Sequence, residues 1–453
     1  MRQIFQKYLH LFLVTVSCMS SFLVQAQNNS ITVKQAIDLA LANNYTLRAD
    51  SLNIIMTGQK NKQVAAGFLP QANMASKFNY NAAIPNTMLP GAIAGQPSKD
   101  FVAIPFGTKY DAGTSFEVTQ TIYRKDLKLQ IRAANLYNDI AQTKHALTRE
   151  ELVYQVAASF YGLQSNAELI RTTSKDYKNL KEILAIAKAQ FENGMLKRID
   201  YESLQINVAN KQSQLDQYTT QYNEQLDFFK HLLGLPVTSV LALSEELTLP
   251  ALQPAQDQAQ LAKRLDLHLY SQLIVSKEND LKIIRAEKKP SINAYFKHSF
   301  QSQFSNASKM FDNNYWSHGS TFGVSTSMPL FDGHRRRYRL GVAQTELQQL
   351  KWQSEEKQQR AQTELFTAWE KLNNNKRQFN TNTQNLVLAE KVFESRKALY
   401  AEGVSSLIEL LDAEKELSQA RNLHLQSMIS VQTGQLEVHR ANGTLLTEYL
   451  KSL

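Results

Sequence analysis

Two short stretches decide the fold of this chain. Residues 120–126 read QTIYRKD, and 208 positions later residues 328–334 read MPLFDGH, so that Ile122 and Tyr123 match Leu330 and Phe331. Each stretch follows a segment in which apolar and polar residues alternate, and each precedes a long run with helical spacing. The sequence therefore predicts, twice, a β-strand that leads into a long helix.

The match extends along the chain and predicts two internal repeats. Further landmarks pair in the same order: Leu47 with Leu267 and Pro70 with Pro290 at an offset of 220, Tyr161 with Trp369 at 208, and Gly194 with Gly403 and Gly234 with Gly443 at 209. The drop from 220 to 208 places twelve additional residues in the first copy, before its strand-to-helix junction. We assign the first repeat to residues 27–237, an inter-repeat linker to 238–263 and the second repeat to 264–453.

Period-two alternation predicts four β-strands, which form two hairpins at residues 70–123 and 290–331. In the first strand Ala72, Met74, Phe78 and Tyr80 share a mostly apolar face, and the fourth strand is expected to continue through Met328 and Leu330; the connecting segments 83–112 and 306–320 read as outward loops. Strands of about ten residues can cross an outer membrane when tilted, although a soluble sandwich also alternates. Four strands cannot close a barrel, and lipid does not tolerate open sheet edges, so a membrane barrel must be shared between chains.

The remainder of each repeat is predicted to be helical. Thr32 and Gln35 form a capping box that opens a helix. Residues 126–192 and 335–402 show apolar positions in steps of three and four, which indicates coiled-coil helices of roughly 100 Å at 1.5 Å per residue. Gly194 and Gly403 interrupt these helices, and a second helix of about 35 residues follows each break. The predicted fold class is mainly α, with a β-barrel portion and a long coiled-coil tunnel.

The first 26 residues have a basic start, an apolar run and the small-residue ending Val24-Gln25-Ala26. We interpret them as a signal peptide with the mature start at Gln27. The alternative is a lipoprotein acylated at Cys18, the sole cysteine. After residue 26 there is no apolar run of 18 or more residues, so we expect an exported chain without a helical membrane anchor.

The composition and motifs argue against an enzyme. The 453 residues carry a net charge of +9, and the sequence has neither a GxG nor a GxxxxGK[ST] phosphate loop and no HExxH pair. We therefore expect no catalytic residue, cofactor or bound metal. The basic run at residues 334–339 opens a helix beneath a membrane strand, where a girdle facing lipid headgroups or water is commoner than a nucleic-acid site.

Several motifs together resemble the TolC family of outer-membrane efflux channels, over nearly the whole mature chain. They are ITVKQAIDLALANN (31–44), GFLPQ (67–71), LLGLP (232–236), MPLFDGHRRR (328–337) and YAEGVSSLIELLDAEKEL (400–417). The resemblance implies a homotrimer in the outer membrane of a Gram-negative bacterium, with four strands per chain in a twelve-stranded barrel and a helical tunnel across the periplasm. It also implies a passive exit duct that docks on a periplasmic adaptor and an inner-membrane pump, in tripartite efflux or type I secretion.

The resemblance further implies a periplasmic gate. Glu409 and Asp412 match positions that threefold symmetry turns into acidic rings, although Ser406 with Glu409 also reads as a capping box. Tyr400 and Asp200 match positions of polar links between neighbouring tips. Ser405 stands where the family pattern usually has an arginine, so one link is lost.

The same resemblance assigns adaptor docking to the two helical tips. The residues concerned are Gly194, Met195 and Leu196 in the first tip and Gly403, Val404 and Leu407 in the second, whose apolar members would offer surface on a polar end. Two other classes remain possible from the sequence: a periplasmic coiled-coil adaptor and an outer-membrane structural lipoprotein. Drug, metal and protein cargo cannot be distinguished from these residues.

Overall fold

The computed structural model describes residues 30–244, 261 and 263–450, so the expected signal peptide, Cys18 and most of the linker lie outside it. The chain forms two compact units, and each unit draws on both predicted repeats. The strand unit comprises residues 51–144 and 266–357. The tip unit comprises the chain up to residue 50, residues 145–265 and residues from 358 onward.

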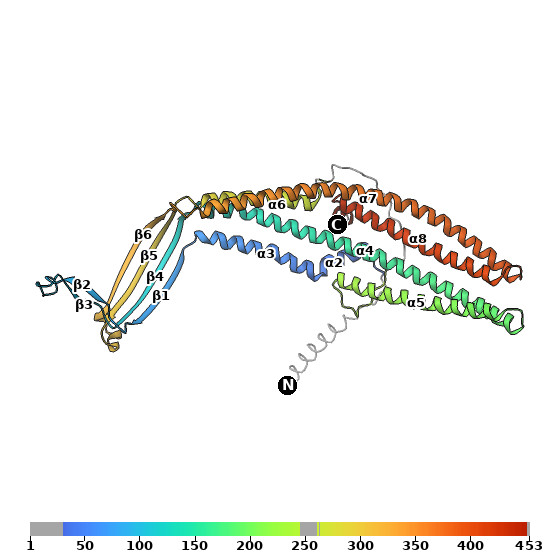
Figure 1. Cartoon of the computed structure of the whole chain (residues 1–453), viewed down its shortest axis with the longest axis horizontal. Coiled ribbons are helices and arrows are strands. Elements are labelled where there is room, and N and C mark those ends of the chain that lie inside the picture. The colour runs from blue at the N-terminus through green and yellow to red at the C-terminus, as the bar shows by residue number, and fades with distance from the viewer. Residues whose placement is uncertain (1–29, 245–260, 262, 451–453) are drawn as a thin grey trace, which may run out of the picture. The chain divides into compact units, whose positions relative to one another are not determined.

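The strand unit contains the four predicted strands in one antiparallel sheet (Figure 1). They are β1 (Gln71–Tyr80), β4 (Tyr110–Tyr123), β5 (Ser291–Phe304) and β6 (Trp316–Ser327), in the order β1-β4-β5-β6. The prediction of four strands is confirmed, and β1 and β6 are the two edges of the sheet within the chain. Met328 and Leu330 were wrongly placed in the last strand. Strand β6 ends at Ser327 because Pro329 cannot donate to a ladder, and a turn with Gly333 at φ 64° follows.

The first outward segment contains more structure than the sequence predicted. Strands β2 (Asn86–Pro90) and β3 (Phe101–Pro105) form a separate two-stranded sheet, and Figure 1 shows this hairpin beyond the end of the larger sheet. The prolines in this segment hid the strands, because proline is depleted in strand interiors. In the second segment, two 3₁₀ turns, η4 (Ala307–Phe311) and η5 (Asn313–Tyr315), precede β6. The loops are therefore shorter than predicted.

The sheet register keeps the predicted faces together across all four strands. Met74 pairs with Phe116, and Phe116 pairs with His298, so even-numbered residues share the mostly apolar face. Ser76, the polar exception on that face, is satisfied by a 3.0 Å hydrogen bond with Thr114. On the opposite face Lys77 lies 3.5 Å from Asp111. One face is thus suited to lipid and the other to water.

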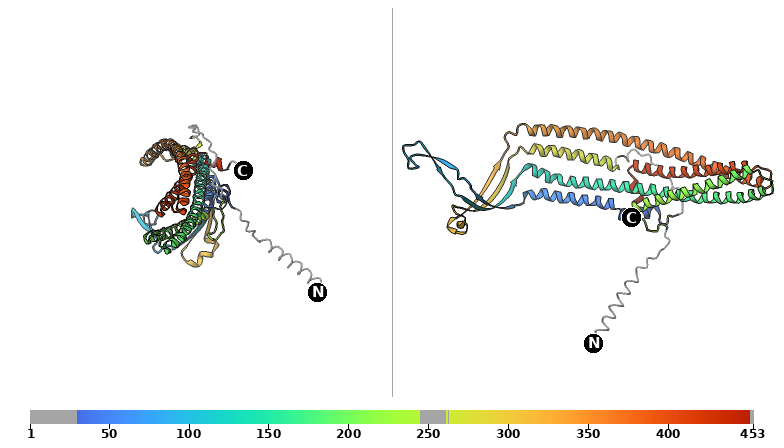
Figure 2. Two further views of the ribbon diagram at one scale, coloured as in Figure 1. Left: turned by 90° about the vertical axis from the view of Figure 1, so that its right-hand side faces the viewer. Right: turned by 60° about the horizontal axis from the view of Figure 1, so that its bottom comes forward.

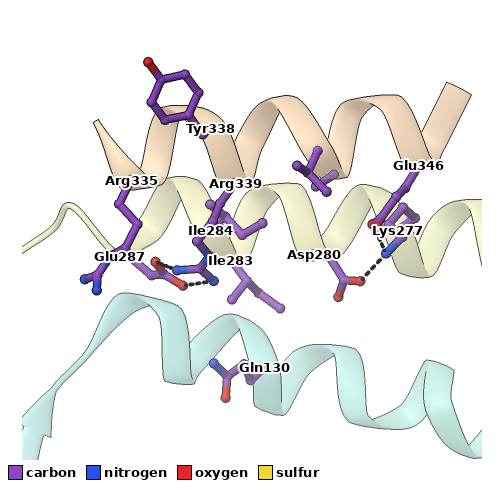
Figure 3. Close-up of a pocket in the computed structure, with 12 residues that line it drawn as sticks. Gln130, Lys277, Asp280, Ile283, Ile284, Glu287, Arg335, Tyr338, Arg339 and Glu346 are labelled. Atoms are coloured by element: carbon purple, nitrogen blue, oxygen red, sulfur yellow. Dashed lines mark hydrogen bonds and ion pairs between the residues drawn. The ribbon is translucent and has the colours of Figure 1, made fainter. Parts of the chain in front are cut away.

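Four helices of the strand unit approach the sheet: α3 (Tyr45–Ala65), α4 (Lys125–Glu192), α6 (Leu265–Ala286) and α7 (Arg335–Ala401). The long helices α4 and α7 have 68 and 67 residues and confirm the predicted lengths. Figure 3 shows how charges join α6 to α7 and the segment after α6: Lys277 lies 2.8 Å from Glu346, and Arg339 makes two hydrogen bonds to Glu287. These pairs flank an apolar surface that includes Ile283 and Ile284. None of the helices in the described part of the chain is both long and apolar enough to span a membrane.

The tip unit adds α2 (Val33–Asn43), α5 (Arg198–Leu232), α8 (Leu407–Ala441) and α9 (Leu445–Leu450). Thr32 and Gln35 form the predicted capping box at the start of α2. Gly194, Gly234, Gly403 and Gly443 all have φ between 68° and 74°, the left-handed conformation in which helices end on glycine. A core around Phe160 and Phe229 packs α4 and α5 against α2.

Candidate functional site

The two helical hairpins of the tip unit share one apolar core near their turns. The hairpins are α4–α5 and α7–α8, drawn in Figure 2 with their turns at one end. We call this the tip core; it consists of Leu180, Ile183 and Ala187 from α4, Leu204 from α5, Phe393 and Tyr400 from α7, and Leu407, Leu410, Ala413 and Leu417 from α8. Burial of these side chains holds the two predicted tips together in one unit.

Exposed apolar side chains surround the two turns. Met195 is 73% exposed and Val404 is 72% exposed, whereas Leu196 is half-buried and packs against the tip core. Leu407 is 5% exposed and belongs to the tip core, so the expectation that it adds surface is wrong. Ile199 and Ile408 are exposed and were missed, because each lies just inside a helix where the sequence pattern alone does not show which side is covered.

Glu409 has two roles at the start of α8. Its backbone N–H donates to Ser406 Oγ at 3.3 Å, which makes Ser406 the N-cap. Its carboxylate instead accepts from Ser405 Oγ at 2.5 Å and from Arg396 at 3.0 Å. The Ser405 hydrogen bond, followed by the charge of Arg396, lowers the pKa of Glu409. The carboxylate is therefore held in its ionised form.

Asp412 and Asp200 are less constrained. Asp412 is exposed on α8, one turn after Glu409, and makes no ion pair or side-chain hydrogen bond with any described residue. Asp200 lies in the first turn of α5, and its backbone N–H donates to the Lys197 carbonyl at 3.1 Å. Its carboxylate likewise has no side-chain partner among the described residues. Neither carboxylate is therefore fixed in place by a side chain of the described residues.

Tyr400 links the two hairpins within the chain. Its hydroxyl donates to Gln190 Oε1 at 3.0 Å, and this bond joins α7 to α4. Burial of the phenol raises the pKa of Tyr400. Inside one chain the hydroxyl is thus paired with Gln190 rather than with Asp200. Gln190 was missed because a glutamine in a long helix carries no distinctive sequence signal.

A second link between the hairpins consists of buried charges, which we call the inter-hairpin charge cluster: Asp176 of α4, Lys211 of α5, and Glu414 and Arg421 of α8. Arg421 lies 2.5 Å from Asp176, and Lys211 lies 3.4 Å from Glu414. Burial raises the pKa of Asp176 and of Glu414, and it outweighs the opposing effect of the neighbouring cations. The sequence did not reveal this cluster, because charges on coiled-coil helices usually face water.

The basic run at the start of α7 is partly paired. Arg336 lies 3.3 Å from Asp332, and Arg339 pairs with Glu287, whereas Arg335 and Arg337 are exposed. Among the residues that the structure describes, no group of three His, Cys, Asp or Glu side chains could hold a metal ion.

Comparison with known proteins identifies the class to which this fold and these tips belong. The family model described as "Outer membrane efflux protein" matches residues 36–235 and 257–444, so the chain is a member of the outer membrane efflux protein family.

Relatives and solved structures agree with this assignment. The chain is 22% identical over 420 residues to the probable outer membrane lipoprotein SilC of Salmonella typhimurium, covering 91% of this chain and 85% of that protein. It is also 22% identical over 428 residues to the toluene efflux pump outer membrane protein TtgF of Pseudomonas putida, covering 91% and 83%. The CusC crystal structure superposes with a TM-score of 0.73 at 19% identity, covering 91% of this chain and 92% of CusC.

The chain is accordingly an outer-membrane efflux channel of a Gram-negative bacterium, with a large periplasmic part. Its role is transport rather than catalysis, as predicted. The family match favours the channel over the periplasmic adaptor.

Proposed function

We propose that this protein is a homotrimeric exit duct that carries cargo passively across the outer membrane. The observation that supports the proposal most directly is the four-stranded sheet with one apolar face and two free edges, β1 and β6. An open edge is costly in lipid, and three such sheets joined edge to edge make a closed barrel of twelve strands.

The helical tips are the proposed docking surface for a periplasmic adaptor. Met195 and Ile199 beside the first turn, and Val404 and Ile408 beside the second, expose apolar area at the end of an otherwise polar pair of hairpins. Exposed apolar side chains of this kind mark protein–protein contacts. Gly194 and Gly403 allow the tight turns that present them.

The proposed gate is formed by acidic side chains near the same tips. In a threefold assembly Asp412 and Glu409 each become a ring, and rings of like charge in a narrow pore attract cations and repel one another. Asp412 is the stronger candidate, because it is exposed and has no cationic partner among the described residues. The negative charge of Glu409, by contrast, is compensated by an ion pair with Arg396. Tyr400 and Asp200 are proposed to link neighbouring tips.

The energy for transport is proposed to come from an inner-membrane pump, in a tripartite efflux or type I secretion system. The chain has no phosphate-binding loop. Relatives are named for toluene efflux and for pyoverdine export. Such different cargoes suggest that the pump, and not the duct, selects the substrate.

Planar-bilayer conductance of the detergent-purified protein, with its mass measured by light scattering, tests the proposal. We expect a trimer that gives small, cation-preferring steps, and Asp412→Ala should enlarge the steps because it removes a charge ring. Glu394→Ala is the matched control, since it removes one exposed acid from α7 of the same unit. A monomer that stays soluble without detergent and never inserts would overturn the barrel and restore the adaptor interpretation.

A further inference from the structure

The inter-hairpin charge cluster draws on several helices of the tip unit. Asp176 and Arg421 have side chains that are 7% and 14% exposed, and those of Lys211 and Glu414 are both 11% exposed. Arg421 also lies 3.6 Å from Glu390 of α7. Helices α4, α5, α7 and α8 therefore all contribute a charge.

The pairing pattern of this cluster crosses from one hairpin to the other. Asp176 and Lys211 belong to hairpin α4–α5, whereas their partners Arg421 and Glu414 belong to hairpin α7–α8. Lys211 Nζ also donates a 3.0 Å hydrogen bond to Ser418 Oγ, which likewise joins α5 to α8. Exposed pairs nearer the turns behave differently: Lys188–Glu192 and Arg198–Glu202 each join residues of one helix.

The Asp176–Arg421 pair lies at the end of the tip core that is farther from the turns, whereas Glu414 lies between the core residues Ala413 and Leu417. Asp176 precedes Leu180 by one helical turn, and Arg421 follows Leu417 by one turn. The distance along α4 from Asp176 to the turn at Gly194 is roughly 27 Å at 1.5 Å per residue. Apolar contacts thus join the hairpins near the turns, and the Asp176–Arg421 pair joins them farther from the turns.

The buried ion pairs resist separation but are not fully satisfied. Separating a buried pair while its members remain away from water leaves uncompensated charge, which is strongly unfavourable. Glu414 Oε1 is buried and has no hydrogen-bond partner among the described residues, although Lys211 is within ion-pair distance. This half of the cluster is held by charge rather than by a directed hydrogen bond, so water that enters between the hairpins can release it.

We propose that Asp176, Lys211, Glu414 and Arg421 form a clasp that limits how far the two tip hairpins of each chain can part, and so limits the aperture of the channel. The inference rests on the proposed channel function. The clasp acts by positioning the hairpins, and its members are buried between helices, whereas Asp412, proposed to line the entrance, is exposed. Opening the entrance beyond a certain width requires the cluster to be hydrated.

The first test compares Arg421→Met with a matched control in the planar-bilayer assay. Arg421→Met keeps an unbranched apolar stem but removes the charge that pairs with Asp176, so single-channel conductance should rise several-fold in intact trimers. Lys188→Met removes an exposed cation from the same region, where the pair is confined to α4, and should leave conductance unchanged. Arg421→Lys should recover much of the original conductance.

A double-mutant cycle shows whether the effect of each substitution comes from loss of the Asp176–Arg421 pair or from general loosening of the tip unit. If Asp176 and Arg421 act together, the combination of Asp176→Asn with Arg421→Met should raise conductance no further than the larger single change. Additive effects would indicate two independent perturbations and would overturn the clasp.

A cross-link tests the inference by replacing the Asp176–Arg421 ion pair with a covalent link between the same two positions. The sequence has no cysteine after Cys18, so Asp176→Cys with Arg421→Cys supplies one defined thiol pair. A short bis-methanethiosulfonate reagent, which joins the two thiols through disulfides, should hold conductance at the low level, and reduction of those disulfides should raise it. Trimers that conduct normally but respond to neither the substitutions nor the cross-link would refute the clasp alone. Protein that forms no channel in any variant would refute the proposed function.

Discussion

At the scale of the residue, Ser405 shows how a change of side chain is compensated locally. The resemblance leads one to expect an arginine there, but the serine hydroxyl donates to Glu409, and Arg396 on α7 supplies the positive charge. The pair Arg396–Glu409 joins α7 to α8 within one hairpin. Charge balance at the second tip is therefore kept inside the chain.

Tyr400→Phe should raise single-channel conductance modestly. The change removes the hydroxyl that donates to Gln190, and a neutral hydrogen bond contributes about 1 kcal/mol. Tyr201→Phe is the matched control, because that ring stacks on Phe191 at 5.2 Å and its hydroxyl is not bonded to a described residue. Equal conductance for wild type and Tyr400→Phe would show that this bond does not restrain the tips.

Gly234→Ala should lower the thermal unfolding midpoint more than Gly194→Ala. Both residues have positive φ, so alanine costs roughly 1–2 kcal/mol of unfolding free energy at either position. At Gly234 a Cβ would also lie 2.5 Å from the carbonyl oxygen of Asn43, whereas at Gly194 it would meet no atom within 4 Å. Circular dichroism melting of the two variants makes the comparison, and equal losses would contradict the close approach between Gly234 and Asn43.

At the scale of the element, the hairpins combine an apolar core with buried charge, and this combination makes their packing sensitive to pH. Burial raises the pKa of Asp176 and Glu414 while Lys175, Lys211, Arg421 and Glu390 surround them. The packed hairpins therefore bind protons at pH values where separated, hydrated hairpins have released them. Packing becomes more favourable as pH falls from neutral through the raised pKa values, and the gain ends below about pH 4.

Channel conductance should accordingly decrease on mild acidification, because protonation removes the buried carboxylate charge itself. Arg421→Met has the opposite effect, because it leaves that charge buried and unpaired. The measurement is a bilayer titration from about pH 7 to about pH 4, and Asp176→Asn with Glu414→Gln should flatten the curve. His424 and His439 act in the opposite direction, because burial lowers their pKa below 6.5 and protonation then costs stability. Conductance that rises on acidification in the wild type, and equally in the double variant, would assign the response to the histidines.

At the scale of the whole molecule, the separate β2–β3 sheet is an addition to a complete four-stranded sheet. Tyr80 pairs directly with Tyr110, and Asn81 N–H donates to the Lys109 carbonyl at 2.8 Å. Strands β1 and β4 are therefore fully paired up to the base of the β2–β3 hairpin. The offsets place twelve additional residues in the first copy between Pro70 and Tyr123, the stretch that contains this hairpin. The pairing of the four-stranded sheet therefore does not depend on this hairpin, and we expect assembly not to require it.

Replacement of residues 83–106 by a short glycine-rich turn should leave the trimeric state and the conductance unchanged. Shortening residues 306–315 is the comparison, because Trp316 Nε1 donates to the Met310 carbonyl at 2.8 Å and so ties that segment to β6. We expect the second change to lower thermal stability. Loss of trimers on removal of the β2–β3 hairpin would show that it takes part in assembly.

The sequence by itself determined the four strands, the long helices and the glycine breaks, because these follow from local periodicity and backbone conformation. It also determined the family, through motifs that recur in order. The tertiary structure decided which side chains meet: it buried Leu407, paired Tyr400 with Gln190, and brought Asp176 to Arg421, 245 residues later. An amphipathic helix records its period in sequence but not its neighbour, so contacts between helices appear only when the hairpins pack.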